Sequence, residues 1–455
     1  MVILYHFCVT IIGMDEKKWQ GVVKNAYLMI LLIIFGGVVL HAPLSVFLSS
    51  LMPSYVMFFK AWKEILLFLA IILILYLLIQ KKRLKLLYSP LLILIGCYGL
   101  LHLVLALLIK NSFLSIVAGL MIDLRYLVYF CLVYIAIRLW PDLRGKFVRV
   151  FAYGALIVAI FAVLQVFVLP KNILEYIGYG RTTIAPYLTV DQNKDFIRIN
   201  STLRGPNPLG AYLMVVLDLI LAYFISIKFA ILKSKKRLAL AALFICCLIG
   251  LWCSYSRSAL LAAAISLILV VILSSSCHLS IKNMKFVAIG LVLLGGCAVL
   301  LFTNSYFVSN VLLHENPSEG NGVNSNEGHL SSLISGVINV SRQPFGAGIG
   351  STGSASLLGA DSTIIENQYL FVAHEAGWLG LALFLVICGY VMVNLWRARR
   401  DWLGLGVFVG GVGLMIIGLM LPVWADDTVS IIWWGLAAVI IGGDYVKSKS
   451  QQKSV

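Results

Sequence analysis

Charge is the scarcest property of this sequence. Only 12% of its 455 residues are charged, whereas 61% are hydrophobic. Soluble proteins average about a quarter charged and about half apolar residues, so this chain has too few polar side chains to cover its apolar surface in water. The apolar residues also form uninterrupted runs of about 20 residues, the length of a helix that crosses a bilayer. We therefore predict one polytopic, all-α integral membrane domain over residues 1–455 and exclude a set of soluble domains.

Acidic residues and paired cysteines are scarce as well. The chain has 19 Asp and Glu against 35 Lys and Arg, a net charge of +16. No basic stretch is interleaved with stacking aromatics, so we expect no nucleic-acid partner, and the excess is typical of basic cytoplasmic loops. None of the nine cysteines forms a Cys-x-x-Cys pair, and almost all lie in apolar runs. We expect buried thiols, with no disulfide framework and no metal site.

Twelve apolar runs are predicted to be transmembrane helices, with the N and C termini both cytoplasmic. This count places the Lys and Arg clusters at 81–85, 138–149 and 397–400 in inner connections, as the positive-inside rule requires. The expected helices are 22–41, 62–80, 88–109, 115–138, 147–169, 207–229, 238–254, 257–275, 285–303, 365–394, 402–421 and 428–446.

Two apolar segments fall outside this set. Residues 43–59 are broken by Pro43 and Pro53, which favours a re-entrant or surface segment. Residues 1–14 lack the charged start and the cleavage site of a signal peptide. For them two interpretations stay open, an extra interfacial segment or a wrongly chosen start codon.

Two extracytoplasmic loops are long. The first covers residues 170–206, and the second covers 304–364 and is rich in Gly, Ser and Asn. Loops of this length in a compact protein are usually functional or disordered. Residues 329–340 of the second loop carry apolar side chains at helical spacing on one face, which predicts an amphipathic helix lying in the outer interface.

Arginines at the outer membrane face are the main functional signal, because ionisable groups at a bilayer are costly and often functional. Arg204 precedes Asn207 at the mouth of the sixth helix, and Asn207 is a candidate cap for that helix. Arg257 lies in a tight turn between the next two helices. Two such cations beside helix N-termini suit an anion such as diphosphate. The alternative is that each pairs with lipid headgroups.

Further candidates lie inside the helices and in the second loop. Asp123 and Arg125 do not face each other along their helix, so each is expected to pair with another helix or to line a cavity. Gly346, Gly348 and Gly350 form a turn similar to a phosphate-cradling loop, although a flexible linker explains the same pattern.

Glu366 stands at the outer mouth of the tenth helix. A carboxylate there is a candidate general base toward a sugar hydroxyl. The alternative is a helix-start acid favoured by the helix dipole.

Together these segments resemble the O-antigen ligase and O-antigen polymerase superfamily of bacterial envelope enzymes. The resemblance covers about residues 200–385 and depends on the order of the motifs. These are Arg-Gly-Pro-Asn at 204–207, Ser-Arg at 256–257, a long outer loop with an amphipathic helix, Pro-Phe-Gly-x-Gly-x-Gly at 344–350, then Asn-x-Tyr-Leu and Glu-x-Gly-x-x-Gly at 367–380.

The resemblance implies a GT-C-like, metal-independent, inverting glycosyltransferase that needs no cofactor. It would work on the outer face of the bacterial cytoplasmic (inner) membrane, as a surface polysaccharide polymerase or ligase. The donor would be a glycan on undecaprenyl diphosphate and the acceptor a glycan or a lipid. Membrane lipids and a chain-length regulator would be the other partners.

The resemblance also implies roles for individual residues. Arg204 and Arg257 would bind the diphosphate and stabilise the leaving group, and a base would deprotonate the acceptor hydroxyl. The family usually has His where this chain has Glu366, and often begins its amphipathic helix with Arg where His329 stands nearby. The base is therefore Glu366, His329 or His374. The other expected substrate contacts are Asn207, Gly346, Gly348, Gly350, Asn367, Tyr369, Glu375 and Arg125.

Two questions stay open at the level of sequence. The absence of the usual His weakens a strict ligase role and slightly favours a polymerase or a divergent branch. The alternative function, from another class, is a transporter or flippase for a lipid-linked or polyanionic precursor. A transporter would place charges along a path across the bilayer and carry internal repeats, whereas the candidate charges cluster at one face and no clear repeat is present.

Overall fold

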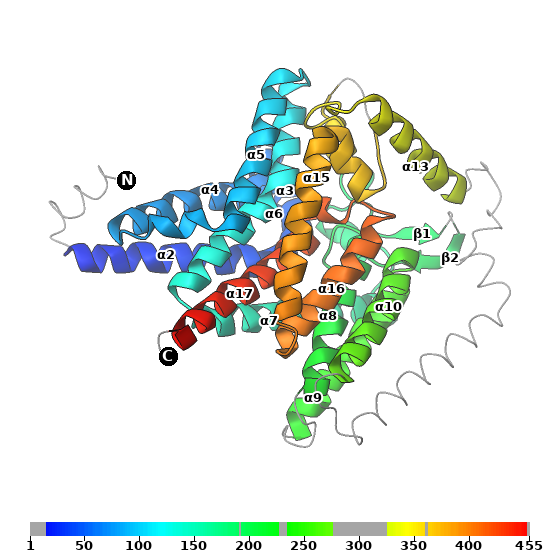
Figure 1. Cartoon of the computed structure of the whole chain (residues 1–455). Coiled ribbons are helices and arrows are strands. Elements are labelled where there is room, and N and C mark those ends of the chain that lie inside the picture. The colour runs from blue at the N-terminus through cyan, green and yellow to red at the C-terminus, as the bar shows by residue number, and fades with distance from the viewer. Residues whose placement is uncertain (1–14, 191–192, 227–233, 276–324, 360–362, 453–455) are drawn as a thin grey trace.

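The computed structural model describes residues 15–190, 193–226, 234–275, 325–359 and 363–452 (Figure 1). The expected helix 285–303, the segment 1–14 and the first part of the second long loop lie outside the described residues. Within the described part, nine helical segments are long and apolar enough to cross a membrane, and two shorter apolar helices accompany them. They match the expected helices one for one, apart from 285–303. The protein is therefore a helical, multi-pass membrane protein.

The α-helices of the described residues range from a single turn to 30 residues. In chain order they are α2 (Glu16–Gly37), α3 (His41–Leu51), α4 (Val56–Gln80), α5 (Pro90–Leu108), α6 (Phe113–Leu139), α7 (Leu143–Phe167), α8 (Pro206–Ser226), α9 (Ser234–Cys253), α10 (Arg257–Ser275), α13 (Ser325–Arg342), α14 (Gly353–Ser356), α15 (Gln368–Arg397), α16 (Trp402–Gly418) and α17 (Asp427–Gln452).

The segment 43–59 is more helical than the sequence indicated. A 3-10 turn at Val38–Leu40 joins α2 to α3, and the helix is interrupted only between Met52 and Tyr55. Pro43 lies in the first turn of α3, where a residue without an N–H breaks no helical hydrogen bond. Only Pro53 coincides with a break in the helix. The prediction that both prolines interrupt this segment therefore overestimated its irregular length.

The core lies where α17 packs along α6 and where α8 packs against α16 and α10. Trp424, Trp433 and Trp434 are fully buried there. The Trp434 ring centroid lies 5.4 Å from that of Tyr126 and 5.7 Å from that of Phe130, both on α6. Aromatic packing of this kind adds to the stability gained from buried area. It fixes the start of α17 against α6, beside the site described below.

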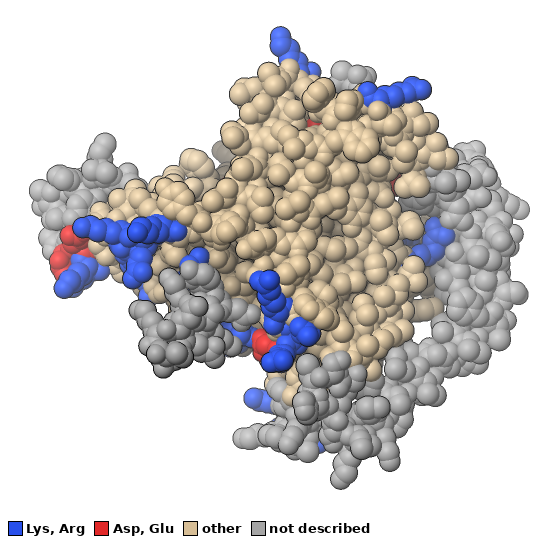
Figure 2. Space-filling view, in the orientation of Figure 1, with Lys and Arg blue, Asp and Glu red and all other residues tan. Residues whose placement is uncertain are grey.

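Charged side chains are nearly absent from the middle of the described surface, and Lys and Arg gather toward its margins (Figure 2). Lys24 and Lys81 lie over the ring of Trp140, at 5.3 and 5.2 Å from its centroid. Arg144 hydrogen-bonds Asp401. The start of α2 and the connections α4–α5, α6–α7 and α15–α16 thus meet at one end of the bundle, which we call the basic end. Their shared position is what the alternation of inner and outer connections predicts.

The opposite end, which we call the loop end, holds residues 168–190, 193–205, 343–359, 363–367 and 419–426. A two-stranded antiparallel hairpin, β1 (Leu188–Val190) and β2 (Asn193–Arg198), lies in the first of these segments and is an addition to the all-α expectation. The α5–α6 connection is also here, because Asn111 Nδ2 donates to the carbonyls of Ala347 and Ile349 at 3.3 and 3.1 Å.

The amphipathic helix of the second loop is confirmed and longer than expected, as α13 spans Ser325–Arg342 instead of 329–340. Its apolar side chains Leu333, Ile334, Val337 and Ile338 are 40–52% exposed. The helix is held to the bundle by a hydrogen bond of 3.2 Å from Trp378 Nε1 on α15 to the carbonyl of Val340. An outward apolar face on a tethered helix suits the bilayer interface.

Candidate functional site

A cavity of about 450 Å³ opens at the loop end, between the start of α8, the α14 region, the start of α15 and the α16–α17 connection. One part of its wall is polar and the rest is apolar, so it suits an amphiphilic ligand. The polar side chains that line it are Arg204, Asn207, Ser354 and Asp426. The apolar part includes Leu188, Leu357 and Ile364, which are 43%, 63% and 59% exposed.

Arg204 is the cation of this cavity. It is exposed, and in the described part of the chain it makes no hydrogen bond or ion pair. The helix that follows adds few donors, because α8 begins at Pro206 and Pro208 is also in its first turn. Proline has no N–H, so Asn207 alone offers a backbone donor among these three residues. The Arg204 guanidinium is therefore a stronger candidate anion ligand than the helix end, contrary to the expectation from sequence.

Asn207 does not cap α8, because it lies inside the first turn of the helix. Its Oδ1 accepts a hydrogen bond of 2.6 Å from Arg198 Nη2, and Arg198 Nε donates to the carbonyl of Ser254 at 3.0 Å. Arg198 on β2 thereby connects the start of α8 to the turn before α10. Sequence reasoning missed this residue, because nothing local shows that the hairpin folds back onto α8.

Arg257 is the first residue of α10 and is half-buried. The turn that precedes it packs closely on α8, since a Cβ on Gly210 would lie 3.1 Å from Ser254 Oγ and 2.7 Å from the Cβ of Ala259. Arg257 is not among the residues that line the cavity. The two arginines therefore lie at neighbouring helix starts, and only Arg204 faces this cavity.

Asp426 is the acidic residue of the cavity, and sequence reasoning did not select it. It is the cap of α17, since its Oδ1 accepts from the backbone N–H of Val429 at 3.0 Å. Burial and the neighbouring charge of Asp427 raise the pKa of Asp426 to about 6, although Arg204 and Arg125 oppose the shift. The sequence signal was present: two adjacent acids open an apolar helix.

Asp427 points to the other side, into a buried cluster of ionisable groups. Its Oδ2 lies 3.0 Å from Lys63 Nζ and 3.2 Å from His41 Nε2. Trp62 Nε1 donates to His41 Nδ1 at 2.9 Å, and an indole N–H only donates, so Nδ1 carries no proton and His41 is neutral. Glu64 completes the cluster, 3.4 Å from Lys63.

Arg125 contacts the segment that carries the cavity carboxylate and does not itself line the cavity. Its Nη1 lies 3.5 Å from Glu64 Oε1 on α4, and its Nη2 donates to the carbonyl of Ala425 at 2.5 Å. The expectation that Arg125 pairs with another helix is confirmed. Because Ala425 precedes Asp426, this contact fixes the position of the cavity carboxylate. We find Arg125 in a positioning role, without a place in the cavity lining.

Glu366, the predicted base, precedes α15 by two residues and is half-buried. It does not share a helical face with Tyr369, because α15 begins at Gln368, and it does not line the cavity. Asn367 caps α15 by accepting from the N–H groups of Tyr369 and Leu370, at 2.9 and 3.0 Å, and donates to the carbonyl of Leu419 at 2.8 Å. Tyr369 donates its hydroxyl to the carbonyl of Met415 at 3.0 Å. These internal bonds join α15 to the end of α16.

The glycine turn packs against protein on several sides. Gly346, Gly348 and Gly350 have φ values of +83°, +92° and +78°. A Cβ on Gly350 would overlap the carbonyl oxygen of Ser115, and one on Gly346 would lie 2.6 Å from that of Glu375. The glycines are therefore explained by close backbone approach to α6 and α15. This is a different reason from the phosphate cradle that the pattern predicted.

Glu375 secures the turn from α15. Its Oε1 accepts from the N–H of Thr352 at 3.2 Å, and it also accepts from the N–H of Gly350. It also faces Asp123 on α6, whose Oδ2 lies 3.6 Å from His102 Nε2 on α5. Asp123 Oδ2 and Glu375 Oε2 are buried without a hydrogen-bond partner in the described part of the chain, so a proton shared between the two carboxyl groups would satisfy both. The expectation that Asp123 pairs with another helix is confirmed.

Of the two remaining histidine candidates, His374 does not line the cavity. His374 is 5% exposed on α15, and its Nδ1 is buried without a hydrogen-bond partner in the described part of the chain. The backbone of His329 belongs to α13, and its side chain is outside the described residues.

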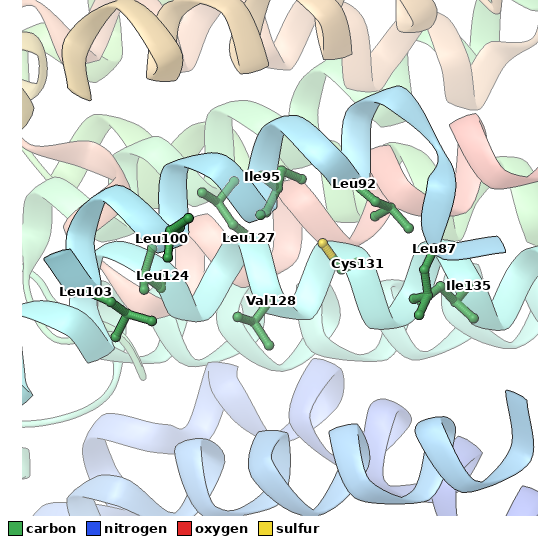
Figure 3. Close-up of a pocket in the computed structure, with 12 residues that line it drawn as sticks. Leu87, Leu92, Ile95, Leu100, Leu103, Leu124, Leu127, Val128, Cys131 and Ile135 are labelled. Carbon is green, nitrogen blue, oxygen red and sulfur yellow. The ribbon is translucent and has the colours of Figure 1, made fainter. Parts of the chain in front are cut away.

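A second cavity of about 490 Å³ runs between α5 and α6 (Figure 3). It is lined by aliphatic side chains, two glycines and Cys131, among them Leu92, Leu100 and Val128. It shares no lining residue with the first cavity and offers no ionisable group for chemistry except the thiol. Such a groove suits a lipid chain, and the first cavity remains the candidate active site.

Comparison with known proteins bears on the same region. Residues 241–385 match the family model described as O-antigen ligase. This part of the chain is similar to the O-antigen ligase family. The match confirms the resemblance to the O-antigen ligase and polymerase superfamily and includes Arg257, the glycine turn and the start of α15. No curated protein matches the chain.

The O-antigen ligase segment makes the chain a glycosyltransferase-like membrane enzyme of polysaccharide biosynthesis. Arg204 and Asp426 stand outside the matched residues, one on each side of them in the sequence. The described residues contain no cluster of His, Cys, Asp and Glu that could hold a metal ion. The matched segment contributes Gly353, Ser354, Leu357, Ile364 and Phe371 to the cavity lining, and segments outside it supply the charged side chains.

Proposed function

We propose that this protein transfers or polymerises glycan from an undecaprenyl-diphosphate donor, with the donor diphosphate bound at Arg204 in the loop-end cavity. The observation that carries this proposal is the exposed, unpaired guanidinium in a cavity with an apolar opening. A diphosphate would pair with the arginine through charge-assisted hydrogen bonds. The first isoprene units would lie against Leu357 and Ile364. We place the loop end at the outer face of the bacterial inner membrane.

The chemistry that follows is an inverting displacement without a metal. An acceptor hydroxyl attacks the anomeric carbon while the bond to the diphosphate breaks. Negative charge grows on the leaving oxygen, and the Arg204 guanidinium stabilises it in a partly desolvated cavity. A base takes the hydroxyl proton. Glu366, His329 and His374 were proposed as this base from the sequence, and Arg257 as a second phosphate ligand.

The test is a transfer assay with purified protein, a lipid-linked oligosaccharide and EDTA. We expect Arg204→Ala to lower kcat/KM by about 10²–10³, the usual cost of removing one preorganised group that stabilises transition-state charge. Arg204→Lys should recover part of the rate, because it keeps the charge and loses the bidentate geometry. Arg181→Ala is the matched control, an exposed arginine of the first loop outside the cavity lining.

Two outcomes contradict the proposal. Full transfer by Arg204→Ala would remove the arginine from the mechanism. No transfer by the wild type, together with protein-dependent movement of the lipid across liposomes, would favour the flippase instead.

A further inference from the structure

The loop-end cavity contains one carboxylate, and it lies opposite the proposed diphosphate ligand. Asp426 and Arg204 both line the cavity although 222 positions separate them in the sequence. Asp426 Oδ1 is held by the N–H of Val429. In the described part of the chain Oδ2 has no hydrogen-bond partner, and it is not fully buried. One oxygen is thus anchored, and the other is accessible to a ligand.

The adjacent carboxylate is placed in the opposite environment. Asp427 is 8% exposed and is held by Lys63 and by neutral His41. Its charge is therefore balanced inside the cluster, and it stays ionised next to Asp426. When the environments of two neighbouring acids give them different proton affinities, the difference indicates which one acts as acid or base. Here the ionised member is buried in an ion pair, and the titrating member faces the cavity.

We propose that Asp426 is the general base that deprotonates the acceptor hydroxyl. This assignment depends on the proposed function and replaces Glu366, which does not line the cavity. In the step, the acceptor oxygen forms a bond to the anomeric carbon, and the bond from that carbon to the diphosphate oxygen breaks. The diphosphate leaves with the electron pair toward Arg204. The hydroxyl proton passes to the carboxylate of Asp426, so charge and atoms balance.

The pH dependence follows from the groups that face Asp426. Asp427 and burial raise its pKa to about 6, while Arg204, Arg125 and the Val429 N–H lower it. A base must be ionised to act, so the rate should increase with pH through about 6 and level off above it. A base with an ordinary aspartate pKa would place this limb near 4.

The structural role of Asp426 can be separated from the catalytic one. Asparagine accepts the same cap hydrogen bond from Val429 but cannot take a proton from a hydroxyl. Asp426→Asn should therefore fold as the wild type does and lower kcat by about 10²–10⁴, the usual contribution of a general base. The KM for the donor should change little. Asp142→Asn, an exposed aspartate before α7, is the matched control.

The experiment measures kcat, KM and the pH profile of transfer for wild type, Asp426→Asn, Glu366→Gln and Asp142→Asn, together with thermal unfolding. Support is a folded Asp426→Asn protein with lost kcat, whose residual rate no longer has the limb near 6. Near-normal turnover by Asp426→Asn, or loss of the limb in Glu366→Gln alone, would overturn the assignment. A wild type without transfer would instead contradict the proposed function, which keeps the two failures distinct.

Discussion

At the scale of single residues, buried charge is concentrated around Asp427. Lys63 is 2% exposed, and it is the closest cation to that carboxylate. Removing one partner of a buried ion pair costs about 3–5 kcal/mol, because the other charge stays buried without compensation. We expect this cost for Lys63→Met in the unfolding free energy in detergent. Lys60→Met, exposed on the same helix, should change it by less than about 0.5 kcal/mol.

Replacing Asp427 together with Lys63 tests whether the loss of stability comes from the carboxylate that is left unpaired. If Lys63→Met proves harmful only because of Asp427, the double variant Lys63→Met with Asp427→Leu should recover part of the stability. Equal loss in the single and double variants would show that the ion pair contributes nothing.

Glu375 offers a second test at this scale. Glu375→Gln keeps an acceptor for the Thr352 N–H and a donor toward Asp123, so we expect a loss below about 1 kcal/mol. Glu375→Leu removes the partner of two backbone N–H groups and of a carboxyl group, and each orphaned group costs about 1–3 kcal/mol. Thermal unfolding of both variants measures the difference. Equal melting temperatures would contradict the proton-sharing geometry.

The roles of single residues were also the hardest feature to predict from the sequence. Arg204 could be selected because a cation beside a helix start at a bilayer is conspicuous in the sequence. For Asp426 the sequence shows only two adjacent acids before an apolar helix, and its importance depends on α8 and α17 meeting in space. Glu366 was favoured because its neighbours match a family motif, yet it is not among the residues that line the cavity.

At the scale of elements, the glycine turn is the segment that should tolerate substitution least. Gly350 has a positive φ, and a Cβ there would overlap the Ser115 carbonyl. We expect Gly350→Ala to cost more than about 3 kcal/mol, since the turn must move away from α6. Gly99→Ala is the control, because a Cβ on Gly99 meets nothing within 4 Å and alanine favours a helix. Similar yields of folded protein from both variants would contradict the packing role.

Helix positions were predictable at this scale because a membrane span must satisfy its backbone within one apolar segment. Hydropathy therefore found every long helix of the described part. The hairpin β1–β2 and the outward face of α13 were harder to predict from the sequence. Each depends on a contact with a distant segment, such as the Arg198 hydrogen bond to the Ser254 carbonyl.

At the scale of the whole molecule, the two ends of the bundle differ in charge and in chemistry. The basic end gathers the connections around Lys81, Arg144 and Arg399, and the loop end holds the cavity. The positive-inside rule then predicts that the basic end faces the cytoplasm. Cysteines introduced at Lys85 and Arg181 should report this on intact cells. An impermeant thiol reagent should label Arg181→Cys and spare Lys85→Cys, relative to the parent protein.

The reverse labelling pattern would place the cavity in the cytoplasm, where a lipid-linked glycan delivered to the outer face could not reach it. Labelling of both sites would indicate that one of the expected helices does not span the membrane.

Arg204 holds the donor diphosphate in the proposed mechanism, and a structure with a non-transferable lipid-diphosphate glycan tests this contact directly. We predict that a diphosphate oxygen lies within hydrogen-bond distance of the Arg204 guanidinium, with the reducing sugar between it and Asp426. A diphosphate bound elsewhere, at Arg257 away from the cavity or at the mouth of the α5–α6 groove, would contradict the mechanism.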